Sequence, residues 1–113
     1  MIEKIIYDYL GVRAPFPVFM EIPAGGATPP YAVIQKTGSG MVDGIVSSAT
    51  LAIQSFGATL YEAAQTNELV KALMARAIEL PEIARCRCSS DYNFTDTTKR
   101  EYRYQAVFEI IHY

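Results

Sequence analysis

The chain has no tryptophan, one histidine and two cysteines, so it offers few of the side chains that build metal centres or histidine-based catalytic sites. It also has no apolar run of 18 residues, the length that a membrane-spanning helix needs. Its 10 lysines and arginines are outnumbered by 12 aspartates and glutamates, which disfavours a domain that covers nucleic-acid phosphates with positive charge. These shortages predict a protein that is not an enzyme and holds no cofactor or metal. They also argue against a membrane or sequence-specific nucleic acid as its partner.

What is present suits one folded domain over residues 1–113, because half of the chain is hydrophobic and 19% is charged. The first six residues mix both charges with apolar side chains. They lack the basic start, the continuous apolar stretch and the small-residue cleavage site of a secretory signal. We therefore expect a small domain that is made in the cytosol.

Two segments have the apolar spacing of amphipathic helices. In residues 1–10, apolar side chains occupy positions 2, 5, 6, 9 and 10, and Gly11 is suited to end the helix. In residues 59–80, Thr59 and Glu62 have the spacing of a capping box, and Pro81 stops the helix. The second segment predicts the long helix of the fold.

Five further segments predict strands. Residues 18–22, 31–36 and 48–56 are short runs rich in apolar and β-branched side chains. Residues 84–94 and 102–110 alternate over a greater length, with their even-numbered positions on one face and a polar turn between them. Such alternation is typical of an antiparallel hairpin with one face buried.

The predicted fold is therefore a single α+β domain with a mainly antiparallel sheet and the element order α-β-β-β-α-β-β. The last two strands should be adjacent, and the long helix should pack on one face of the sheet. The residues expected in the core are Leu51, Ile53, Val70, Met74, Cys86, Tyr104 and Phe108.

Cys86 and Cys88 are the first candidates for special chemistry. Residues i and i+2 of a strand share a face and lie about 6.6 Å apart along the chain, which would strain a disulfide. Zinc requires four donors, and His112 is the only histidine that could join the two thiolates. We therefore expect both cysteines to be reduced, free of metal and used as small hydrophobic side chains.

A glycine-rich segment joins the second and third predicted strands. It contains Gly38, Gly40 and Gly44 but no lysine, so it lacks the residues of a phosphate-binding loop. Glycine makes a connection costly to order, yet this one carries apolar side chains. We expect residues 38–48 to be mobile in a free subunit and to become ordered against a partner. The apolar candidates for this interface are Met41, Val42, Ile45 and Val46.

Arginine side chains gather on the predicted terminal hairpin. Arg85 and Arg87 share a strand face, and Arg103 lies on the outward face of the next strand. Acidic residues also occupy outward positions of the same hairpin. Two interpretations remain open for these arginines: cross-strand ion pairs on a solvated face, or a charged protein–protein interface. The eight tyrosines fit either the rim of a core or an interface.

The order of these segments resembles a family of phage proteins. An N-terminal helix and a proline-rich lead-in come before Pro30-Tyr31-Ala32-Val33-Ile34-Gln35, and a glycine-containing loop comes before Leu51-Ala52-Ile53-Gln54-Ser55-Phe56. A helix with Tyr61-Glu62-Ala63-Ala64 follows, and the last strand carries Tyr102-Arg103-Tyr104-Gln105-Ala106-Val107-Phe108. Over essentially the whole chain, this pattern is similar to the tail terminator, or tail completion, proteins of long-tailed bacteriophages.

The resemblance implies a structural assembly protein of a phage or prophage tail. Members of that family are α+β domains that form rings, usually hexamers, and no catalytic residue is implied. The ring caps the tail tube, ends its polymerisation and offers a docking face to the head. The implied partners are further copies of the chain, the tail tube protein and a head-completion protein. The implied location is the host cytoplasm during assembly and then the virion.

Two other functions stay open. One is another head–tail joining protein or minor tail component of the same size. The other, of a different class, is a small ligand-binding or enzymatic α+β domain, which needs an enclosed pocket lined with converging polar groups. No Ser-His-Asp, Cys-His or paired-carboxylate arrangement is recognisable in the sequence.

Overall fold

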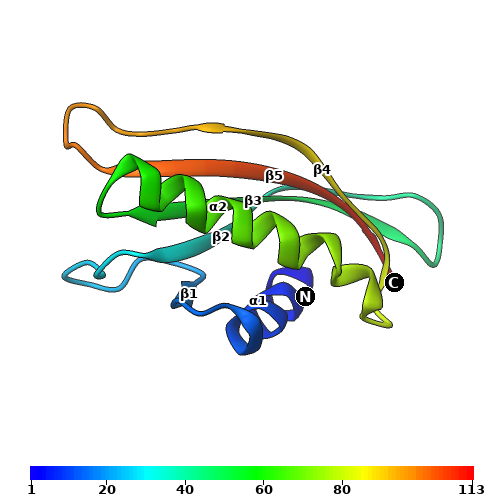
Figure 1. Ribbon diagram of the computed structural model, residues 1–113. Helices are drawn as coiled ribbons and strands as arrows, with labels where there is room; N and C mark the ends of the chain where they lie inside the picture. Colours follow the sequence, from blue (N-terminus) through cyan, green and yellow to red (C-terminus); the bar gives the residue numbers. More distant parts are fainter.

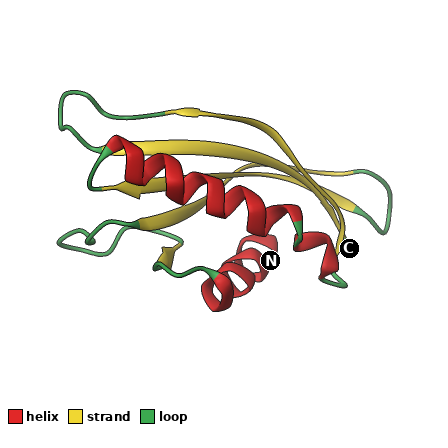
Figure 2. Ribbon diagram, in the orientation of Figure 1, coloured by secondary structure: helices red, strands yellow, loops and turns green.

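Both helices lie on the same face of a five-stranded sheet, and the other face carries no helix (Figure 1, Figure 2). The computed structural model describes residues 1–113. The observed order confirms the predicted α+β fold with the sequence α-β-β-β-α-β-β. The elements are α1 (Ile2–Arg13), β1 (Val18–Phe19), β2 (Tyr31–Met41), β3 (Ser47–Gly57), α2 (Leu60–Ala75), the short 3-10 helix η1 (Ala77–Glu79), β4 (Ile83–Asn93) and β5 (Tyr102–His112).

The sheet has the strand order β1-β2-β3-β5-β4 and is antiparallel except where β1 runs parallel to β2. As predicted, β4 and β5 are adjacent. The hairpin turns of β2–β3 and β4–β5 lie at opposite ends of the sheet (Figure 1). Ser47, which follows the β2–β3 turn, pairs with His112 at the end of β5, whereas Tyr102, which follows the β4–β5 turn, pairs with Gly57 at the end of β3. The two long hairpins are paired side by side through β3 and β5. The molecule is therefore elongated, with extents of 44 × 26 × 26 Å.

The core fills the space between the helices and the sheet. Leu51 and Ile53 of β3, Phe108 of β5, and Val70 and Met74 of α2 are each at most 1% exposed, as predicted. Because α1 and α2 both cover this one face, the apolar residues of β3 and β5 that point toward it lose nearly all contact with water.

Two residues predicted to lie in the core, Cys86 and Tyr104, are only half-buried. The physical reason is position. Cys86 belongs to β4, the edge strand of the sheet, whereas α2 packs mainly over β3 and β5. Tyr104 lies toward the β4–β5 turn, where its neighbour on β4 is the polar Asn93.

The predicted start of α2 is confirmed in detail. The Thr59 hydroxyl oxygen accepts a hydrogen bond from the Glu62 N–H at 3.1 Å, which is the capping-box contact. The Glu62 carboxylate accepts from the Ala58 N–H at 2.8 Å, one residue before the N-cap. The α-helix ends at Ala75, earlier than the predicted residue 80, and η1 follows it. Leu80 then adopts an extended backbone, as expected for a residue in front of a proline.

Two other boundaries differ from the predictions. Gly11 does not end α1, which continues to Arg13 and stops where Ala14 turns extended in front of Pro15. The first strand covers two residues instead of 18–22.

A β-bulge in β4 reverses the predicted alternation of residues 84–94. Cys86 and Cys88 share the helix-side face as predicted, opposite Ile110 and Phe108. Between Cys88 and Ser90 the register shifts, so that Asp91 comes to lie opposite the buried Ala106. The even-numbered positions beyond the bulge therefore point away from the helices. On the helix side, Asp91 instead meets α2, where its carboxylate lies 3.3 Å from both the Asn67 Nδ2 and the Lys71 Nζ.

Candidate functional site

The tip of the β2–β3 hairpin brings the four predicted apolar interface residues together at one end of the sheet (Figure 1). Met41, Val42 and Ile45 are 75%, 60% and 79% exposed. Val46 is half-buried. Isolated exposed apolar residues are common, but three at one hairpin tip form a small apolar surface outside the core cluster.

The connection between β2 and β3 is a hairpin tip and is shorter than the predicted residues 38–48. β2 continues through Gly38 and Gly40 to Met41, and β3 begins at Ser47, so only residues 42–46 form the turn. The Val46 carbonyl accepts hydrogen bonds from the N–H groups of Val42 and Asp43, at 2.9 and 3.2 Å. The hairpin therefore extends almost to its tip.

Asp43 fixes the shape of this turn. One oxygen of its carboxylate, Oδ1, accepts hydrogen bonds from the N–H groups of Ile45 and Val46, at 2.8 and 2.9 Å. These two backbone donors favour the charged form and hold the pKa of Asp43 below its usual value. The apolar side chains are thus presented on a turn that has its own internal bonds.

Arg85 and Arg87 lie on the helix-free face of the hairpin, opposite Ile111 and Glu109. Arg87 donates to the Glu109 carboxylate at 2.6 Å across the two strands, with both side chains at least half exposed. For Arg87, the structure therefore shows the cross-strand ion pair that was one of the two interpretations. Arg85 takes part in no ion pair within 4.0 Å. Its cross-strand neighbours run through Ile111 and Ser48 to Gly40, so it lies at the end of the sheet that carries the β2–β3 tip.

Arg103 is not brought together with the other two arginines. It lies six positions before Glu109 on β5, or about 20 Å along the strand. Its guanidinium donates to the Phe94 carbonyl at 2.7 Å and to Glu101 at 3.1 Å, and it lies 4.8 Å from the centre of the Phe94 ring. Arg103 thus holds the aromatic end of the β4–β5 hairpin rather than joining a basic patch.

The two cysteines differ in their surroundings. Cys86 packs against the core. Burial, and to a smaller extent the neighbouring Cys88, raises the pKa of its thiol to about 11. Cys88 is exposed, which corrects the expectation that it fills the core, and its pKa is raised by partial burial and by Asp91. Both thiols are free, and no three histidine, cysteine or acidic side chains converge on one point.

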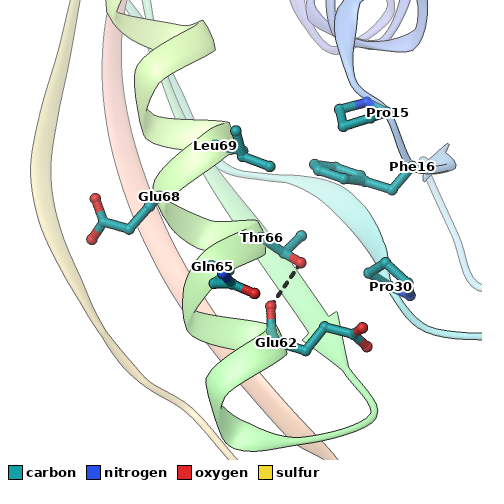
Figure 3. Close-up of a pocket in the computed structure, with 8 residues that line it drawn as sticks. All are labelled: Pro15, Phe16, Pro30, Glu62, Gln65, Thr66, Glu68 and Leu69. Carbon is teal, nitrogen blue, oxygen red and sulfur yellow. Dashed lines mark hydrogen bonds between the residues drawn. The ribbon is translucent and has the colours of Figure 1, made fainter.

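A groove beside α2 was not foreseen from the sequence (Figure 3). It has a volume of about 540 Å³, with an apolar side formed by the segments around residues 15–16 and 30 and an acidic side formed by the first half of α2. No local pattern pairs Phe16 with Leu69, which are far apart in the sequence, so sequence reasoning had no signal for it. The lining residues are Pro15, Phe16, Pro30, Glu62, Gln65, Thr66, Glu68 and Leu69.

Neither helix is long and apolar enough to cross a lipid bilayer. Comparison with models of known protein families finds none that matches this chain, and comparison with curated proteins finds no significantly similar sequence. The fold and the surfaces described above therefore supply the structural basis for assigning a function.

Proposed function

We propose that the protein is a structural assembly protein of a phage or prophage tail, which forms a ring that caps the tail tube, ends its polymerisation and joins it to the head. The observation that carries the proposal is the apolar tip of the β2–β3 hairpin. The segment order of the chain, which resembles that of tail terminator proteins, supplies the identity of the assembly.

The tip supports an assembly role because its apolar side chains do nothing for the isolated subunit. Met41, Val42 and Ile45 keep most of their surface in water, where each contributes little to folding. Transfer of such surface into a protein contact is favourable by about 25 cal/mol per Å². Because Asp43 already holds the turn in shape, little conformational entropy is lost when it docks. A second subunit of the ring or the tail tube is the partner that fits this surface.

The same surface would serve another head–tail joining protein or a minor tail component. A terminator caps the tail tube and these proteins do not, so an assay of tube capping distinguishes them. No observation favours the ligand-binding or enzymatic alternative. In the groove, the Thr66 hydroxyl donates to the Glu62 carbonyl at 2.8 Å, and the Glu62 carboxylate is held by the Ala58 N–H. Both contacts are local to the first turns of α2 and mark no enzymatic site.

The test replaces the four tip residues, Met41, Val42, Ile45 and Val46, with serine. Sedimentation and negative-stain imaging give the assembly state, and the length of tubes grown from the tail tube protein of the same genome gives the capping activity. The wild-type chain should form rings and shorten the tubes. The quadruple variant should keep a similar melting temperature and lose both activities, whereas the control Val12→Ser with Ile78→Ser, which removes exposed apolar groups elsewhere, should keep them.

Three outcomes would contradict the proposal in different ways. Wild-type rings that leave tube length unchanged would favour the head–tail joining alternative. A wild-type chain that neither assembles nor binds tubes would remove the assembly role altogether. A quadruple variant that unfolds would show that the tip belongs to the subunit's own core.

A further inference from the structure

The groove beside α2 has the chemistry of a docking site for a basic segment. Phe16 and Leu69 provide an apolar floor, and Leu69 is 46% exposed although it faces this hollow. Glu62 and Glu68 stand along the helix side of the groove, and no lysine or arginine lines it. Figure 3 shows Gln65 between these two glutamates, with Glu62 toward the apolar residues and Glu68 pointing away from them on the outer side of α2.

The acidic side of the groove is not neutralised within the subunit. Lys71 is the one cation that pairs with it, at 3.0 Å from Glu68, and Lys71 is shared with Asp91 at 3.3 Å. Two carboxylates, of Glu68 and Asp91, therefore share a single ammonium group, and Glu62 pairs with no cation. A segment that fits the groove would present an apolar stem together with positive charge.

The β4–β5 turn presents that chemistry. Lys99 and Arg100 are adjacent and exposed, and neither takes part in any of the ion pairs of the chain. The turn is rigid, because Asp96 and Glu101 exchange backbone hydrogen bonds at 3.0 Å and the Asp96 carboxylate accepts from the N–H groups of Thr98 and Lys99.

The backbone of Arg100 points to a use for its side chain. Its φ of 53° lies in the left-handed region, where glycine is free of strain and a residue with a Cβ atom is not. The chain nevertheless carries an arginine there. Within its own subunit the turn lies against a separate hollow beside Gly57 and Ala58, and it does not line the groove.

We infer that the groove of one copy binds the Lys99–Arg100 turn of the next copy. This inference rests on the ring assembly proposed above and names the surfaces that join neighbouring subunits. The aliphatic parts of the two basic side chains lie on Phe16 and Leu69. One charged end reaches Glu62, and the other extends past Gln65 over α2 toward Glu68. Charge complementarity selects this occupant over the β2–β3 tip, whose only charged side chain is Asp43.

Turn and groove are different surfaces, so the contact between two copies is heterologous. Each copy that joins through its turn still has a free groove, and association continues until the chain of subunits closes on itself. A symmetric contact between identical patches would stop at a dimer. The β2–β3 tip, at the far end of the sheet from this turn, remains free for the tube or for a further contact (Figure 1).

The test uses two variants with opposite charge changes. The turn variant is Lys99→Glu with Arg100→Glu, and the groove variant is Gln65→Lys with Glu68→Lys; Glu62 is left intact because it caps α2. Each variant alone places like charges on its turn and groove, and its association constant measured by sedimentation should fall at least tenfold. An equimolar mixture pairs opposite charges at every contact and should restore assembly as rings of alternating variants.

Two controls match these changes. Lys99→Arg with Arg100→Lys keeps the charge of the turn and should assemble like the wild type. Glu79→Lys with Glu82→Gln adds the same three positive charges as the groove variant at exposed positions outside the groove and should also assemble. Melting curves establish that each variant is folded, and the single changes Arg100→Glu and Glu68→Lys replace any double variant that melts early.

Assembly of either charge variant alone, or a mixture that stays monomeric, would overturn the inference. If the charge variants still form rings and cap tubes, the ring proposal stands and only this assignment of surfaces fails. A wild-type chain that stays monomeric even on the tube would overturn both.

Discussion

A Cβ atom added to Gly57 would lie 2.3 Å from the backbone nitrogen of Ala63, so the last residue of β3 touches the first turn of α2 directly. The same atom would lie 2.8 Å from the Thr59 carbonyl oxygen. The neighbours are backbone atoms that cannot rotate away. This contact fixes where α2 leaves the sheet, and with it the position of the acidic side of the groove.

Gly57→Ala should therefore destabilise the fold, whereas the matched change Gly11→Ala should stabilise it. Overpacking against rigid backbone is expected to reduce the free energy of unfolding by about 3 kcal/mol. Gly11 lies inside α1 with no atom within 4 Å of an added Cβ, so alanine there should raise the free energy of unfolding by about 0.5–1 kcal/mol. Urea unfolding measures both. Equal effects at the two sites would contradict the close contact at Gly57.

Phe108→Ala should be among the most damaging changes in the core. The Phe108 ring is 1% exposed between β5 and the helices, and its removal leaves a cavity that the surrounding core fills only in part. The expected loss in the free energy of unfolding is about 3–5 kcal/mol. Phe94→Ala is the control, because that ring is 40% exposed at the hairpin end and should matter less. A loss at position 108 no larger than at position 94 would contradict the packing.

The sequence predicts those parts of the fold that depend on local pattern. The long helix was recognisable because Thr59 and Glu62 mark its start and Pro81 limits its end. The core side of β3 was recognisable because Leu51 and Ile53 share one face, and Thr50 and Gln54 the other. These features depend on residues close together in the chain. The same local rules overestimated the effect of Gly11, because one glycine without tertiary contacts does not end a helix.

Features that depend on pairing between distant segments could not be predicted. The bulge after Cys88 has no clear local signature, yet it reverses the facing of every residue beyond it and brings Asp91 to α2. The groove needs Phe16 and Leu69 side by side, which only the folded chain provides. For the candidate interface, composition identified the apolar tip, but the hydrogen bonds that make it rigid depend on the hairpin register and on Asp43.

Cys88 should react with iodoacetamide before Cys86. With a pKa of about 11, only about one Cys86 thiol in a thousand is ionised at pH 8, and packing against the core shields it further. Cys88 is exposed, although its pKa is also raised. Peptide mass mapping after timed alkylation gives the order of reaction. Faster labelling of Cys86, stoichiometric zinc or a disulfide in freshly prepared protein would contradict the structure.

Asp43 should control both the shape of the β2–β3 tip and the pH range over which it is stable. Its pKa is lowered in the folded chain by the N–H groups of Ile45 and Val46, so the stabilisation of the turn is fully present above the ordinary aspartate pKa of about 3.9. It is lost as the pH falls through the lowered value. The turn should hold from pH 7 to about pH 4 and loosen only in stronger acid.

The substitutions that test this are Asp43→Ala, which removes the acceptor, and Asp43→Asn, which keeps an acceptor oxygen without the charge. Amide exchange protection at Ile45 and Val46 should fall in the alanine variant, and ring assembly should weaken with it because the tip is no longer held in its docking shape. The asparagine variant should keep intermediate protection that no longer changes in acid, since its side chain does not titrate there. Unchanged protection in the alanine variant would mean that the strands alone hold the turn, and the apolar tip would then owe its shape to the hairpin rather than to Asp43.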